Sequence, residues 1–107
     1  MEATLRAIRT DLRLSMNGPV AAGMRKMGLN YRLIFGVDLP RLQEISRKYE
    51  PGAALAERLW SEDVRELKIL ATLLYPPGEM NVEAASRWAE QIDNQELREQ
   101  VCKNLFE

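Results

Sequence analysis

Apolar residues recur at steps of three and four along nearly the whole chain of 107 residues. This is the period of an α-helix that buries one face. The first example spans residues 3–14, where Leu5, Ile8 and Leu12 fall on one side. No segment shows the alternation of apolar and polar residues that is typical of a half-buried strand. The pattern predicts an all-α fold.

Proline and glycine divide this pattern into about six to seven helices. The breaks predicted from them lie at Asn17-Gly18-Pro19, Gly28, Pro51-Gly52 and Pro76-Pro77-Gly78. Four polar residues are placed as N-caps of the helices that follow them, namely Asp38, Ser61, Asn81 and Asp93, the last with Glu96 in a capping box. Short helices with brief connections predict antiparallel pairs, and repeated pairs predict a solenoid-like stack. We expect one domain over residues 1–107.

The inner faces of the later helices can be read from the same spacing. Leu67, Leu70, Ala71 and Leu74 form one such face, and Val82, Ala85, Trp88 and Ile92 form the next. Trp60 and Trp88 lie at core spacing, so burial is the better interpretation of both.

The absence of histidine excludes several classes of site. No zinc site of the Cys/His type and no Ser-His or Cys-His nucleophile pair is possible, so we expect no metal and no cofactor. A single cysteine, Cys102, excludes an intramolecular disulfide, predicts a buried or half-buried inert thiol, and fits a cytoplasmic protein. The longest apolar stretch, Leu67 to Tyr75, contains Lys68 and Thr72 and is too short to span a bilayer.

Charge is divided unevenly along the chain. Residues 1–48 hold nine basic and four acidic residues, a net charge of +5, whereas residues 49–107 hold six basic and twelve acidic residues, a net charge of −6. Such asymmetry indicates a charged partner or an end-to-end contact, and a solvated surface is the alternative. A basic surface of this kind can bind phosphate backbones without reading bases. The residues placed in a possible DNA-binding surface are Arg6, Arg9, Arg13, Arg25, Lys26, Arg32 and Arg41.

The last predicted helix carries an apolar set without a following helix to cover it. Leu97, Val101, Leu105 and Phe106 make up this set. Uncovered apolar surface usually marks an interface, so we expect a homo-oligomer formed through this end or a chain that continues beyond it.

Several segments together resemble the DNA alkylation repair family, the alkylpurine DNA glycosylases built from HEAT-like helical repeats. The resemblance is carried by Asn30-Tyr31, by the turn from Phe35 to Arg41, by Leu59-Trp60 and by Arg65-Glu66-Leu67. It implies a HEAT-like stack of antiparallel helix pairs. Known members are about twice this length, so the resemblance corresponds to their N-terminal half.

Glycosylases of that family place an aromatic pair and an aspartate at the start of the helix that corresponds to the seventh one here. This chain reads Asn94-Gln95-Glu96-Leu97-Arg98 at that point, without a tryptophan and with a cation where an anion is wanted. The first hypothesis is therefore a non-specific DNA-binding protein that lacks the catalytic cluster. A protein-interaction scaffold is the second hypothesis, and a glycosylase that uses Glu96 or Glu99 is the third.

Overall fold

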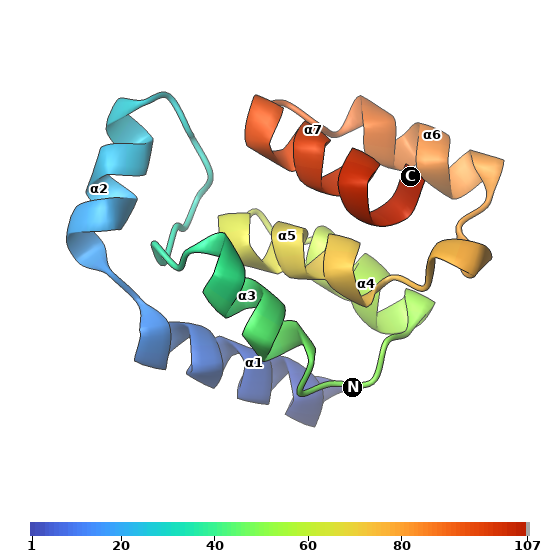
Figure 1. Ribbon diagram of the computed structural model, residues 1–107, viewed down its shortest axis with the longest axis horizontal. Helices are drawn as coiled ribbons and strands as arrows, with labels where there is room; N and C mark the ends of the chain where they lie inside the picture. Colours follow the sequence, from blue (N-terminus) through green and yellow to red (C-terminus); the bar gives the residue numbers. More distant parts are fainter. Residues whose placement is uncertain (107) are drawn as a thin grey trace.

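The computed structural model describes residues 1–106, apart from the side chain of Phe106. Its helices follow one another without an intervening strand in the described residues (Figure 1). They are α1 (Glu2–Ser15), α2 (Gly18–Lys26), α3 (Leu39–Ser46), α4 (Ala53–Trp60), α5 (Arg65–Leu74), the 3-10 turn η1 (Pro77–Glu79), α6 (Val82–Glu90), α7 (Gln95–Val101) and the π-helical turn η2 (Cys102–Phe106). The predicted all-α fold is confirmed.

Two helix pairs run antiparallel. In the first pair, Arg41 at the start of α3 donates to Ser15 at the end of α1, and Lys48 just after α3 pairs with Asp11. In the second pair, the backbone N–H of Gly52, which precedes α4, donates to the carbonyl of Leu74 at the end of α5 at 2.9 Å. These contacts fix the direction of each pair.

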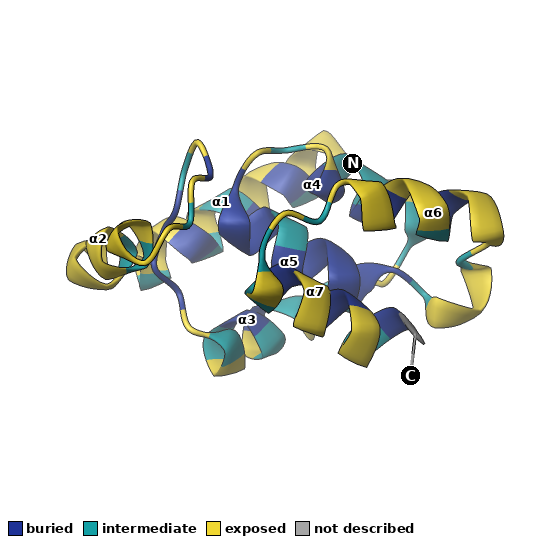
Figure 2. Ribbon diagram, turned by 90° about the horizontal axis from the view of Figure 1, so that it is seen from above, coloured by how far each residue is buried: buried dark blue, intermediate teal, exposed yellow. Residues whose placement is uncertain are grey.

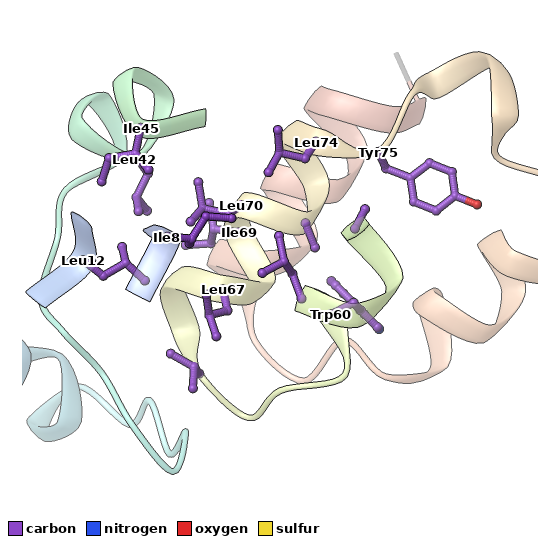
Figure 3. Close-up of a cluster of buried hydrophobic side chains, with 14 of the residues drawn as sticks. Ile8, Leu12, Leu42, Ile45, Trp60, Leu67, Ile69, Leu70, Leu74 and Tyr75 are labelled. Carbon is purple, nitrogen blue, oxygen red and sulfur yellow. The ribbon is translucent and has the colours of Figure 1, made fainter. Parts of the chain in front are cut away.

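Helix α5 lies at the centre of the core (Figure 3). Eight of its ten residues are buried, so this helix has neighbours on nearly every side. Ile8 and Leu12 of α1 and Leu42 and Ile45 of α3 form one flank of the same core. The predicted inner faces of α1 and α5 are confirmed.

The helix starts test the predicted caps. Asp38 accepts from the N–H of Arg41, and Asn81 accepts from that of Ala84, as predicted. Ser61 was the wrong cap for α5, since it ends α4 and donates to the carbonyl of Arg58. Asp93 was also wrong, because Asn94 caps α7. Glu96 does not form the expected capping box, because its carboxylate binds Arg65 of α5.

Helix α6 departs from its predicted inner face at Val82, whereas Trp88 and Ile92 pack as predicted. Val82 was expected on the inner face but is 83% exposed, whereas Ala84 and Trp88 are buried. Trp88 lies on the inner face as predicted, and its ring stacks on Trp60 with a centroid separation of 3.9 Å and an interplanar angle of 6°. The predicted burial of both tryptophans is confirmed.

The apolar set expected to stay uncovered on α7 lies in the chain's own core. Leu97, Val101 and Leu105 are buried, because α7 and η2 pack against α5. The prediction of an uncovered surface was wrong for these three residues, and the side chain of Phe106 lies outside the described residues. Cys102 was expected to be at least half-buried but is exposed.

Helix α2 differs from the others because it buries no residue. It stands beside the rest of the molecule and is connected to it by the loop that follows it (Figures 1 and 2). Within residues 1–106, no helix has the length and apolar character needed to cross a bilayer.

Candidate nucleic-acid interface

The seven basic residues predicted to bind DNA lie on four consecutive segments. Arg6, Arg9 and Arg13 belong to α1, Arg25 and Lys26 to α2, Arg32 to the loop after α2, and Arg41 to α3. Residues 12–37 contain four basic residues and no acidic residue. This part of the chain is therefore the most strongly basic one.

Four of the seven are exposed, have no ionic partner and do not donate to a backbone carbonyl in the described part of the chain. They are Arg6, Arg13, Lys26 and Arg32. The side chain of Arg13 donates only to the hydroxyl of Thr10 on the same helix. These side chains can reach an external anion without first losing an internal ion pair.

The other three are held by neighbouring groups. Arg9 pairs with Glu62 at 2.7 Å, and Arg25 donates to the carbonyls of Tyr31 and Arg32 at 2.8 and 3.2 Å. Arg41 donates to Ser15, as described above. Since these contacts already use the guanidinium groups, the structure divides the predicted set into accessible cations and cations that brace the fold.

A groove of about 450 Å³ lies between the end of α2 and the start of α7. One wall is apolar, with Met24, Met27 and Leu29, and the other carries the polar side chains of Asn94, Gln95 and Glu96. Beneath the second wall, Asn94 donates to the hydroxyl of Tyr31 at 2.8 Å. Burial raises the pKa of that tyrosine, so the hydroxyl stays neutral and can accept this bond.

The loop between α2 and α3 is held by a buried carboxylate. Glu66 accepts from the backbone N–H groups of Phe35, Gly36 and Val37 at 2.9, 3.0 and 3.3 Å. Its side chain is fully buried, and it also accepts from Arg65 at 2.7 Å. A buried charge requires such partners, because desolvation without them costs several kcal/mol.

Arg65 joins this loop to α7. Its Nη1 donates to the carbonyl of Val37 at 2.8 Å, and its Nε and Nη2 donate to the two carboxylate oxygens of Glu96 at 2.9 Å each. Burial opposes the charge on Arg65, but the bonds and charges of Glu96 and Glu66 outweigh it and raise the pKa of this group. Glu96 therefore has neither oxygen free.

The same loop also fixes the start of α2. The N–H of Asn17, the N-cap of that helix, donates to the carbonyl of Phe35 at 2.8 Å. Gly36 follows with a φ of +82°, and a Cβ placed there would lie 2.2 Å from the Asn17 carbonyl oxygen. The position of α2 thus depends on the loop that Glu66 holds.

Sequence reasoning missed this buried network. Glu66 was noted only within the Arg65-Glu66-Leu67 segment of the family resemblance, and Glu96 only as a capping residue or a candidate acid. A signal was available, since Arg65 and Glu66 open a helix that is otherwise almost entirely apolar. The partners themselves lie about thirty positions away in sequence, at separations of 31, 30 and 29 residues for Glu66.

Glu57 forms a second unpredicted cluster. Its two oxygens accept from both Nη atoms of Arg87 at 2.9 and 2.7 Å, and one also accepts from the indole N–H of Trp88 at 2.9 Å. The bonds from Arg87 outweigh desolvation and lower the pKa of this carboxyl. The cluster fixes α6 on α4.

Comparison with known proteins gives one family. A model described as DNA alkylation repair enzyme matches residues 8–107, which is nearly the whole chain. No curated protein and no solved structure matches it.

Proposed function

The chain belongs to the DNA alkylation repair enzyme family, and on this basis we propose that it binds duplex DNA through the phosphate backbone without sequence preference. The observation that carries the proposal is the accessible basic set on α1, α2 and the following loop. Arg6, Arg13, Lys26 and Arg32 are exposed and carry no ion pair within residues 1–106. We also propose a HEAT-like stack and a cytoplasmic location.

Backbone binding is favoured over base reading by the kind and number of side chains. Sequence reading needs side chains that reach base edges in pairs of donors and acceptors. The accessible set consists of cations, which bind phosphates and release counterions. Binding should therefore be weak, with Kd values of about 10⁻⁴ to 10⁻⁶ M at physiological salt.

Excision of alkylated bases is not part of this proposal. The family resemblance implies an aromatic pair and an aspartate at the start of α7, where this chain has Asn94, Gln95 and Glu96. Both oxygens of Glu96 are bound by Arg65. Glu99 is exposed and accepts a hydrogen bond from the side-chain amide of Gln95 at 3.1 Å. The glycosylase hypothesis for Glu96 or Glu99 therefore ranks last.

A protein-interaction scaffold is the second candidate, and one observation favours it. Leu14, Met16 and Met27 are 81%, 55% and 88% exposed in the same segment that carries the basic residues. Exposed apolar side chains gain nothing from a phosphate backbone, whereas a protein partner would bury them. DNA binding and protein binding must therefore be measured by different experiments.

The test is fluorescence anisotropy with a labelled duplex at several salt concentrations. The variant Arg6→Ala/Arg13→Ala removes two accessible cations from α1. Its matched control, Arg47→Ala/Lys103→Ala, removes two exposed cations from outside the basic segment. We expect the first variant to reduce the slope of log K against log salt by about 2, since each phosphate contact contributes roughly 0.9. An equal reduction of this slope in the variant and in its control would favour the protein-interaction scaffold.

A further inference from the structure

The molecule carries opposite charges at the two ends of its long axis. The basic end is formed by residues 12–37, where Arg13, Arg25, Lys26 and Arg32 meet no acidic residue in sequence. The acidic end is formed by η1 and the start of α6, where Glu79 and Glu83 are exposed. The one basic residue in residues 76–97, Arg87, is held by Glu57.

These two ends lie far apart in space. Helix α2 stands at one extreme of the longest axis, which measures 37 Å, and η1 with the start of α6 stands at the other (Figure 1). Within one molecule, the two surfaces therefore cannot neutralise each other.

Exposed apolar side chains gather at the same two ends. Leu14, Met16, Val20 and Met27 are exposed at the basic end, and Val82 is 83% exposed at the acidic end. Among the large apolar residues exposed in the described chain, only Met1 lies outside these ends. The basic end thus combines several exposed apolar side chains with an excess of cations, and the acidic end combines Val82 with an excess of carboxylates. Apolar side chains beside complementary charges are typical of a protein interface.

We propose that the basic end of one copy binds the acidic end of a second copy. Pairing of two basic ends would place like charges together, so the arrangement that satisfies both charge and burial is head-to-tail. Such a contact is heterologous and leaves one free end of each kind, so association continues beyond the dimer unless a ring closes. This inference goes beyond DNA binding and does not depend on it.

The contact is weak and sensitive to salt. Exposed ion pairs contribute little each and are screened at moderate ionic strength. A duplex would compete with the second copy for the basic end, because both use Arg13 and Lys26. DNA is therefore omitted from the test.

The experiment is analytical ultracentrifugation over a wide range of concentration, at low and high salt. The basic-end variant is Arg13→Glu/Lys26→Glu, and the acidic-end variant is Glu79→Lys/Glu83→Lys. The control, Arg47→Glu/Arg98→Glu, makes the same change in net charge as the basic-end variant at exposed positions outside the two ends. Circular dichroism checks that each variant is helical.

We expect the average mass of the unchanged protein to rise with concentration at low salt and to fall to the monomer at high salt. Each end variant alone should stay monomeric, the control should associate, and a mixture of the two end variants should recover association. A monomer at every concentration in low salt would overturn the proposal. So would end variants that associate like the control, or a mixture that fails to associate.

Discussion

Arg65 and Glu96 bind each other through two parallel hydrogen bonds of 2.9 Å, one to each carboxylate oxygen. The pair joins the start of α5 to the start of α7 across 31 positions in sequence. On its other side, Arg65 contacts Glu66, which holds the backbone of the loop between α2 and α3. One buried guanidinium thus connects three segments that are distant in sequence.

Within this network, the buried carboxylate of Glu66 should contribute more to stability than the partly exposed carboxylate of Glu96. We expect Glu66→Gln to lower the free energy of unfolding by about 3 kcal/mol, because it leaves Arg65 buried without its closest counter-charge. Glu96→Gln should cost about 1 kcal/mol, since water reaches its side chain and can replace part of the interaction. Urea unfolding measures both, with the exposed Glu90→Gln as control. Equal costs for the two glutamates would contradict the assigned roles.

Gly36 should tolerate no side chain. Its φ is +82°, and a Cβ would lie 2.2 Å from the Asn17 carbonyl oxygen and 2.9 Å from the Ala21 nitrogen, so backbone would have to move. We expect Gly36→Ala to cost more than about 2 kcal/mol, because strain and overlap add. Gly28→Ala is a matched control, with a φ of +103° and open space around it. It should cost about 1 kcal/mol. If urea unfolding showed the same loss of stability for both glycine variants, the backbone of Asn17 would be free to move away from a Cβ at position 36.

Tyr49 should make stability fall at high pH. Burial, together with the bond and charge of Asp11, raises the pKa of Tyr49 to about 12 from 10.0 in the unfolded chain. The folded state therefore keeps this proton longer, so its contribution is complete below pH 10 and is lost between pH 10 and about 12. Tyr49→Phe should be less stable than the unchanged protein by about 1 kcal/mol at pH 9, with the difference vanishing near pH 12. A constant difference across this range in urea unfolding would contradict the assignment.

Much of the fold could be predicted because its causes are local in sequence. Leu5, Ile8 and Leu12 repeat at the helical period, and Asp38 and Asn81 cap the helix that follows each of them. The period does not fix how one helix is rotated against another. That rotation follows from long-range packing, and Val82 is exposed while Ala84 is buried although Val82 was predicted on the same face as Trp88.

The candidate site was predictable only in part. The list of basic residues required no more than counting charges, but their availability depends on partners such as Glu62 for Arg9 and the Tyr31 carbonyl for Arg25. Periodicity also failed at the end of the chain, where it could not show that α7 folds back on α5. Leu97 and Val101 therefore suggested a surface, although they are core residues.

Catalysis should be absent. We expect no release of 3-methyladenine or 7-methylguanine from alkylated DNA above the spontaneous rate, since the residues at the start of α7 offer no aromatic pair and Glu96 is bound to Arg65. The measurement is chromatography of the released bases. Release well above the spontaneous rate that Glu99→Gln abolishes would contradict this expectation. Glu99 is the better residue for that control, because it lies outside the Arg65 network.

The central claim is that this chain binds the phosphate backbone of DNA. The salt dependence of duplex binding tests this claim most directly. Four accessible cations predict a slope of log K against log salt of roughly −3 to −4, at about 0.9 per phosphate contact. Anisotropy titrations with two labelled duplexes of unrelated sequence should give the same affinity and the same slope. No binding at low salt, or a strong preference for one sequence with a shallow slope, would contradict the account.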